Sequence, residues 1–102
     1  MDATLDKILK KILEIITPEK IILFGSRAKD SNKEDSDYDI LIVKSGIENK
    51  REISRKIYRN LLGTNASVDI IIEMPEIIDK YKDSVGYIYK NILQEGKIIY
   101  GK

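Results

Sequence analysis

Four short, isoleucine-rich runs punctuate the chain, and they constrain its fold more than any other feature. They lie at residues 20–24, 36–43, 68–74 and 97–100. Their length and β-branched content are typical of buried strands. The second run begins with alternating polar and apolar residues and ends as continuous apolar sequence, which predicts a strand whose tail is buried on both faces. The chain therefore has to fold around a small sheet.

The segments between these runs show the periodicity of amphipathic helices. The expected helices are 3–16, 48–62, one beginning at Pro75, and one that includes Val85 and Ile88 and ends at Gly96. Proline suits a first helical position, and glycine suits a helix C-cap. The predicted order is αββαβααβ. It corresponds to a single α/β (α+β) domain over residues 1–102, with a mixed sheet of about four strands flanked by helices.

The composition limits the chemistry that such a domain can perform. The 102 residues include 20 isoleucines, which suffice for one aliphatic core, and 18 basic residues nearly balance 17 acidic ones. The absence of cysteine and histidine excludes disulfides, thiolate and imidazole metal ligands, and the commonest general base. Catalysis would have to use carboxylates, hydroxyls or cations, with a hard metal such as Mg²⁺ if a metal takes part.

The N-terminal segment does not have the pattern of a signal peptide. Charged residues interrupt its apolar positions at helical spacing, and no stretch of about 18 uninterrupted apolar residues occurs in the chain. We therefore expect a cytoplasmic protein that does not insert into a membrane.

Three aspartates lie on or beside the predicted strands. Asp37 and Asp39 are two residues apart, so both should point to the same face, and Asp69 lies inside another apolar run. Burial of an ion costs several kcal/mol unless a partner or a metal compensates for its lost hydration. Two carboxylates on the same face of a strand lie about 6.6 Å apart, which is close enough for both to bind a pair of metal ions. Alternatively, Asp37 and Asp39 lie at a solvated strand start, and Asp69 forms a salt bridge or caps a strand end.

Gly25 and Ser26 directly follow the first predicted strand and begin a predicted helical turn. Glycine lets a ligand approach the backbone closely, and N–H groups at a helix start favour phosphate, with the serine hydroxyl as a further donor. A Gly-Ser pair alone more often marks an ordinary turn. Its value lies in its combination with the aspartates.

The combination reads Gly25-Ser26, ten residues, then Asp37-Tyr38-Asp39, on strand, turn and strand. This pattern resembles the signature of the DNA polymerase β-type nucleotidyltransferase superfamily, with ILFGSRA at 22–28, SDYDILI at 36–42 and VDII at 68–71. The similarity covers almost the whole chain, which looks like the stand-alone minimal nucleotidyltransferases (MNT) that pair with HEPN toxins as antitoxins. Members often have glycine shortly after the Arg-Ala pair, where this chain has Lys29-Asp30.

The resemblance implies a nucleotidyltransferase-like sheet and a magnesium-dependent reaction. Asp37, Asp39 and Asp69 would be the catalytic and metal-binding residues for two Mg²⁺ ions, with Asp69 also helping to take the proton of the attacking hydroxyl. Gly25 and Ser26 would hold the phosphates of ATP or another NTP. Pyrophosphate would then leave as the hydroxyl attacks the α-phosphorus in line.

Arg27 allows two interpretations of equal weight: it neutralises charge on the leaving group, or it forms a surface ion pair with Asp30 or Glu34. Residues 30–39 contain five acids and one base. This local excess of negative charge would repel nucleic acid, so we expect no direct nucleic-acid binding.

The resemblance implies transfer of a nucleoside monophosphate, expected to be AMP, to a hydroxyl of a partner HEPN toxin, expected to be a tyrosine. Relatives that modify small molecules or RNA have an additional acceptor-binding domain, so the acceptor surface is expected on a second chain. Two alternatives remain: a non-catalytic antitoxin that neutralises its partner by binding, and a small-molecule nucleotidyltransferase that acts as a dimer.

Overall fold

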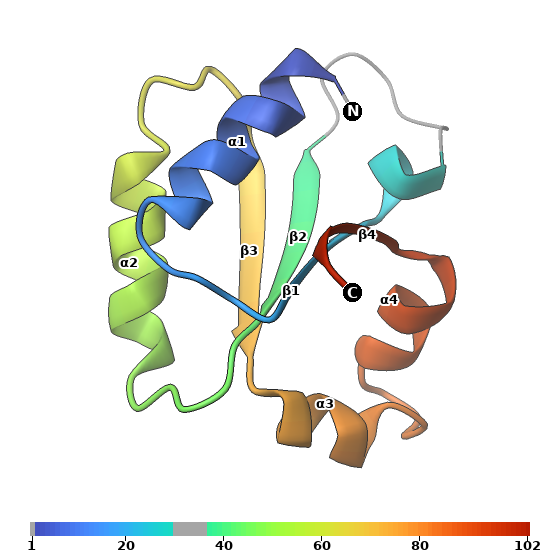
Figure 1. Ribbon diagram of the computed structural model, residues 1–102. Helices are drawn as coiled ribbons and strands as arrows, with labels where there is room; N and C mark the ends of the chain where they lie inside the picture. The colour runs from blue at the N-terminus through green and yellow to red at the C-terminus, as the bar shows by residue number, and fades with distance from the viewer. Residues whose placement is uncertain (1, 30–36) are drawn as a thin grey trace.

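The sheet has four strands in the order β3-β2-β1-β4, with helices on both faces (Figure 1). The structure is a computed structural model that describes residues 2–29 and 37–102. In chain order the elements are α1 (Ala3–Leu13), β1 (Lys20–Phe24), a 3₁₀ turn (Ser26–Lys29), β2 (Tyr38–Val43), α2 (Lys50–Asn60), β3 (Val68–Glu73), α3 (Pro75–Tyr81), α4 (Tyr89–Glu95) and β4 (Lys97–Gly101). The predicted four-stranded mixed sheet and the order αββαβααβ are confirmed.

The strand pairing places the polar starts of β2 and β3 beside each other. β1 is antiparallel to both β2 and β4, whereas β2 is parallel to β3. Asp39 pairs with Phe24 of β1 on one side and with Asp69 of β3 on the other. Because β2 and β3 run in the same direction and in register, their first residues lie at one end of the sheet.

Strand alternation divides the core into two clusters, one on each face of the sheet. On the α1 and α2 face the fully buried side chains are Ile8, Ile12, Ile21, Ile40, Ile42 and Ile57. On the α3 and α4 face the buried cluster consists of Ile22, Leu41, Val43, Ile78, Tyr89 and Ile92. Asp39 and Asp69 are at odd positions on β2 and β3, as Leu41 is on β2, so they belong to the α3 and α4 face.

Capping side chains fix the starts of the two longer helices. Asp2 accepts a hydrogen bond from the N–H of Leu5 at 2.6 Å, and Asn49 accepts one from the N–H of Glu52 at 3.1 Å. At the other end of α2, the Asn60 amide donates to the carbonyl of Lys11 at 2.8 Å. These contacts tie α1 and α2 together as one layer.

The last helix is shorter than the sequence predicts. Val85 and Ile88 were expected within it, but both precede α4 and both are exposed. Gly86 has a φ of 93°, a left-handed conformation that interrupts helical hydrogen bonding. The apolar spacing of Val85 and Ile88 imitates a helix there, but the backbone forms turns. Likewise, α1 ends at Leu13, three residues before the predicted end.

Of the helices in residues 2–29 and 37–102, none combines the length and the apolar character that a membrane-spanning segment requires.

Candidate active site

The predicted aspartates lie at one end of the sheet, at the starts of β2 and β3. Asp39 and Asp69 are direct neighbours across the parallel pair, and Asp37 immediately precedes β2. Asp39 is half-buried, whereas Asp37 and Asp69 are exposed. The apolar run in which Asp69 lies therefore does not bury its carboxylate. β3 is an edge strand, so its first residues face solvent although the sequence around them is apolar.

The charges of these carboxylates act on one another. The pKa of Asp39 is raised above its usual value, first by burial and then by the negative charges of Asp69 and Asp37. Both like charges are therefore close enough to oppose ionisation of Asp39. This combination of partial burial and like charge is typical of carboxylates at functional sites.

The side chains at this end of the sheet offer carboxylate oxygens, the donors that a hard metal such as Mg²⁺ prefers. Within residues 2–29 and 37–102, no three acidic side chains are gathered closely enough to form a ready metal cluster. The donors fit Mg²⁺ nevertheless, because they are carboxylate oxygens and because a cation would relieve the repulsion that raises the pKa of Asp39. Assignment of Asp37, Asp39 and Asp69 as metal ligands stays a prediction.

Gly25 brings the backbone of the first loop against Asp39. Its φ is 74°, which favours glycine, and a Cβ at this position would collide with the Oδ2 atom of Asp39. Ser26 follows as the exposed first residue of the 3₁₀ turn, and Ala28 closes the turn with a hydrogen bond to the Gly25 carbonyl at 3.1 Å. The predicted phosphate-binding turn thus lies beside the carboxylates.

Arg27 contacts Tyr38, the residue between Asp37 and Asp39. Its guanidinium lies 3.9 Å from the centroid of the Tyr38 ring, a cation–π geometry. The Tyr38 hydroxyl donates to the Asp2 carboxylate, with both oxygens at 3.2 Å. Asp30 and Glu34, the predicted ion-pair partners of Arg27, lie outside the described residues. Tyr38 therefore links the start of α1, the loop arginine and the start of β2.

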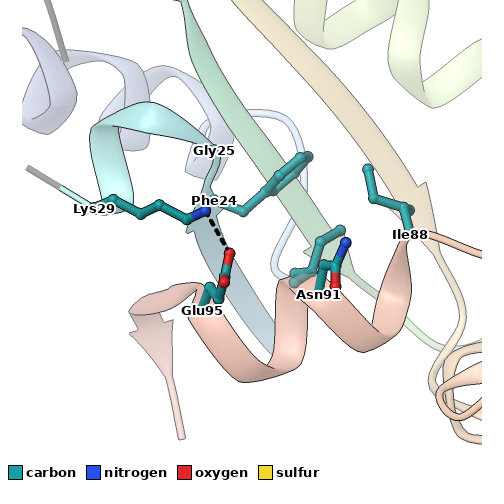
Figure 2. A pocket seen from close by; sticks show the side chains of 7 residues that line it. Phe24, Gly25, Lys29, Ile88, Asn91 and Glu95 are labelled. Carbon is teal, nitrogen blue, oxygen red and sulfur yellow. Dashed lines mark ion pairs between the residues drawn. The ribbon is translucent and has the colours of Figure 1, made fainter. Parts of the chain in front are cut away.

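A pocket of about 280 Å³ opens between this loop and α4 (Figure 2). Its lining consists of Phe24, Gly25, Lys29, Ile88, Asn91, Ile92 and Glu95. Lys29 and Glu95 form an ion pair at 2.7 Å on one side, Asn91 lies farther along α4, and Ile88 lies just before the start of that helix. The pocket shares Gly25 with the predicted phosphate-binding turn.

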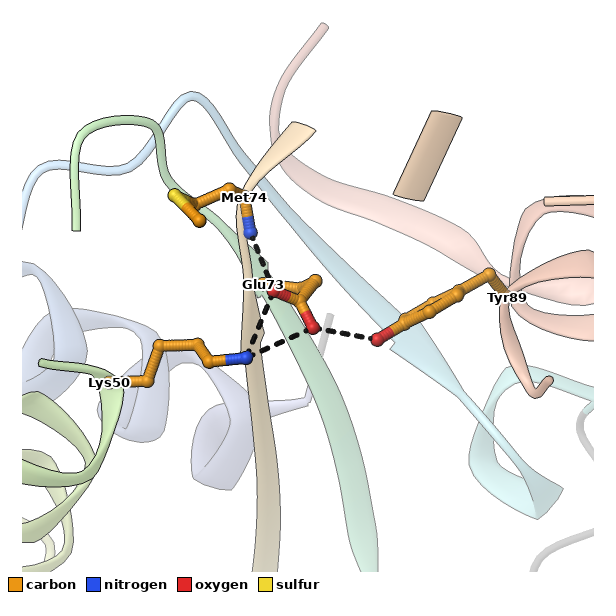
Figure 3. A network of polar contacts seen from close by, with 4 residues as sticks. All are labelled: Lys50, Glu73, Met74 and Tyr89. Atoms are coloured by element: carbon orange, nitrogen blue, oxygen red, sulfur yellow. Dashed lines mark hydrogen bonds and ion pairs between the residues drawn. The ribbon is translucent and has the colours of Figure 1, made fainter. Parts of the chain in front are cut away.

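A second polar network anchors α4 at the far end of β3 (Figure 3). Glu73 is only 6% exposed. Its carboxylate accepts hydrogen bonds from the Tyr89 hydroxyl at 2.9 Å and from the Met74 N–H at 3.2 Å. It also forms an ion pair with Lys50 at 3.1 Å. Burial raises the pKa of Glu73, but the bonds from Lys50, Tyr89 and Met74 outweigh it, so the pKa is lowered overall. Burial and the bond to Glu73 raise the pKa of Tyr89 to about 12.

Several of these residues could not be identified from sequence. Asn91 and Glu95 enter the pocket only because α4 lies across the sheet face, and Glu73 is buried by a helix that begins 16 positions later. Tyr38 did carry a signal, because the residue between two same-face aspartates must point to the opposite face. That position predicts a side chain in the core, and Tyr38 is buried.

Known proteins resemble this chain in both sequence and structure. The family described as "Polymerase beta, Nucleotidyltransferase" matches residues 4–102. A protein from Methanocaldococcus jannaschii, named a "putative protein adenylyltransferase", is 35% identical over 82 residues, which make up 80% of this chain and 78% of that protein.

Three solved structures share the fold. A "putative nucleotidyltransferase" from Sulfolobus solfataricus has a TM-score of 0.61 at 24% identity, covering 97% of this chain and 78% of that one. A toxin–antitoxin crystallised with AMP-PNP has a TM-score of 0.63 at 22% identity, covering 95% and 73%. A mutant of the toxin–antitoxin MntA-HpeT has a TM-score of 0.65 at 17% identity, covering 95% and 72%.

The family match spans nearly the whole chain, and the strand and loop geometry agrees with it. The protein therefore belongs to the polymerase beta nucleotidyltransferase family and is a nucleotidyltransferase enzyme with an α/β fold.

Proposed function

We propose that this chain transfers AMP from ATP to a hydroxyl of a partner toxin and so acts as the antitoxin of a toxin–antitoxin pair. The observation that carries the proposal is the contact of Gly25 with Asp39, beside Asp69 in the parallel register. A polyphosphate and an attacking hydroxyl both need access to such a carboxylate pair. The named adenylyltransferase relative supports adenylate as the group transferred.

Each residue of the site would have a role that its position supports. Gly25 leaves room for phosphate oxygens beside the loop backbone, and the exposed hydroxyl of Ser26 donates a hydrogen bond to them. Asp37, Asp39 and Asp69 would hold Mg²⁺, which supplies positive charge that stabilises the entering and departing oxygens. The exposed carboxylate of Asp69 would accept the proton of the attacking hydroxyl.

The covalent change is a single displacement at the α-phosphorus. A bond forms between the acceptor oxygen and the α-phosphorus, the bond to the bridging oxygen breaks, and pyrophosphate leaves with the electron pair. Neither histidine nor cysteine is needed. Arg27 lies beside this loop, held by the Tyr38 ring, where its charge can offset that of the departing pyrophosphate.

The identity of the partner rests on the toxin–antitoxin proteins that share this fold. We propose a HEPN-domain toxin, as the sequence resemblance implies, with a tyrosine hydroxyl as acceptor. A large acceptor agrees with the exposure of Asp69 at a sheet edge, because a side chain presented by another protein can reach it from solvent.

The test is a transfer assay with the protein encoded beside this gene. The wild-type chain, Mg²⁺ and ATP labelled at the α-phosphate should label that partner, and Asp39→Asn should reduce labelling below detection. Asp6→Asn is the matched control, because Asp6 is an exposed carboxylate on α1, and it should keep full activity. Labelling that survives Asp39→Asn would refute the role of this site.

A growth assay separates catalysis from neutralisation by binding. Expression of the wild-type chain should rescue cells from the partner, and Asp39→Asn should not. Rescue by Asp39→Asn without any transfer of label would instead establish a binding antitoxin.

A further inference from the structure

The pocket between the first loop and α4 has a chemistry that the phosphate and metal residues do not explain. It adjoins the site through Gly25, and its volume of about 280 Å³ is close to the lower limit for small-molecule pockets, about 300 Å³. A pocket of this size suits a ring system better than a whole nucleoside triphosphate.

Its walls differ in polarity along their length. Phe24 and Ile88 supply an aromatic and an aliphatic surface, and the side-chain amide of Asn91 lies beside them on α4 (Figure 2). Nucleobases stack on aromatic side chains with their flat faces and offer hydrogen-bonding groups along their edges. The combination of apolar walls with a neutral amide therefore matches a planar heterocycle.

The polar groups of the pocket are an amide and an ion pair, and these differ in how they complement adenine and guanine. A primary amide has both a donor and an acceptor, which complement the adjacent N6 amino group and ring nitrogen of adenine, whereas a free lysine prefers the O6 and N7 acceptors of guanine. The Lys29 ammonium is paired with Glu95 at 2.7 Å. In contrast, Asn91 forms no side-chain hydrogen bond to any residue of the described segments.

We propose that this pocket holds the adenine ring of ATP and that Asn91 is the residue that selects adenine over guanine. The proposal rests on the proposed adenylate transfer and adds the origin of base preference. Phe24 stacks on one face of the ring, Ile88 contacts it, and the Lys29–Glu95 pair bounds one end of the pocket.

The test measures equilibrium binding of the non-hydrolysable analogues AMP-PNP and GMP-PNP to the full chain in Mg²⁺. The wild type should bind AMP-PNP about tenfold or more tightly than GMP-PNP. Asn91→Asp should reverse or abolish this preference, because a carboxylate accepts two hydrogen bonds from the N1–H and N2–H of guanine and cannot donate to adenine. Asn91→Leu should reduce AMP-PNP affinity without a gain for GMP-PNP.

Gln94→Asp is the matched control. It removes an amide and adds the same charge on the same helix, but Gln94 does not line the pocket, so the preference should equal that of the wild type. Thermal unfolding shows whether each variant is folded. Equal binding of the two analogues by the wild type, or an unchanged preference in Asn91→Asp, would overturn the inference.

The outcomes also separate this inference from the proposed function. An adenine preference that depends on Asn91, in a protein that labels no partner, would support the pocket and refute the transfer. Transfer that depends on Asp39 but uses ATP and GTP equally would support the transfer and refute the pocket.

Discussion

At the scale of single residues, the site depends on the absence of a side chain at Gly25 and on the repulsion between the carboxylate of Asp39 and its acidic neighbours. Gly25 lets the loop backbone touch Asp39, and Asp69 and Asp37 raise the pKa of that same carboxyl. Only the second feature opposes stability, because the carboxylates repel each other, whereas glycine adopts the left-handed conformation of the loop without steric cost. Such local costs are expected where binding a charged ligand requires them.

The role of the Gly25 contact can be tested with two glycines of similar backbone conformation. Gly25 and Gly46 have φ values of 74° and 71°, but a Cβ on Gly46 meets no atom within 4 Å. Either alanine substitution should cost about 1 kcal/mol in unfolding free energy from backbone strain. Only Gly25→Ala should also abolish nucleotide transfer, because its Cβ displaces Asp39.

Urea unfolding and the labelling assay measure the two effects separately. If Gly46→Ala lost transfer to the same extent as Gly25→Ala, backbone strain alone would explain the loss, and contact with Asp39 would have no role.

At the scale of elements, α4 contributes side chains both to the core and to the pocket. Its inner side chains Tyr89 and Ile92 belong to the core, and Asn91 and Glu95 line the pocket. The hydrogen bond from Tyr89 to Glu73 and the ion pair from Lys50 fix its first turn to the ends of β3 and α2. The position of the pocket wall therefore depends on a polar network at the other end of the strand.

Tyr89→Phe should release this anchor while keeping the ring packed. Loss of a hydrogen bond to a buried carboxylate should lower the unfolding free energy by about 1.5–3 kcal/mol. Amide hydrogen exchange in α4 should accelerate more than in α1, because α1 packs on the opposite face. Tyr87→Phe serves as the control, since the Tyr87 ring is half exposed, and its stability should match the wild type. Equal destabilisation by both variants would contradict the anchoring role.

The elements also show which features of the structure can be predicted from the sequence alone. The bounds of strand β1 were predicted correctly because its apolar run is a local signal. Gly25 and Asp39 could be recognised as part of a sequence motif for the same reason. The exposure of Asp69 could not be predicted, since it depends on β3 being at the edge of the sheet. The start of α4 was missed because Gly86 interrupts a spacing that otherwise fits a helix. Asn91 enters the pocket, and Glu73 meets Tyr89 and Lys50, through packing between segments far apart in sequence.

At the scale of the whole molecule, the two faces of the sheet differ in how they are covered. α1 and α2 form a layer over the larger cluster, joined by the Asn60 bond, whereas the shorter α3 and α4 cover the face that carries Asp39, Asp69 and Glu73. The charged groups that matter for pH dependence therefore concentrate on one side.

Acid should destabilise the molecule partly through Glu73. Its folded-state pKa lies below the ordinary value of 4.5, so its contribution to stability is present above pH 4.5 and is lost as pH falls through the lowered pKa. At pH 7, Glu73→Gln should unfold with a free energy about 1–3 kcal/mol lower than that of the wild type. The gap should narrow below pH 4, as urea unfolding at several pH values can show. A gap that stays constant from pH 7 to pH 3 would exclude this origin.

The unequal cover of the sheet also bears on how this protein can change over evolutionary time. Asp2 and Lys50 contact Tyr38 and Glu73, but the α1–α2 layer otherwise packs mainly on the face of the sheet opposite to Asp39 and Asp69, so most of that layer can change in sequence as long as its volume is kept. α4 has no such freedom, because one helix of seven residues, Tyr89–Glu95, both completes a core and lines the pocket beside the catalytic loop. Substitutions in α4 that change the substrate would therefore also lower the stability of the fold, and stabilising substitutions in the α1–α2 layer could offset that loss.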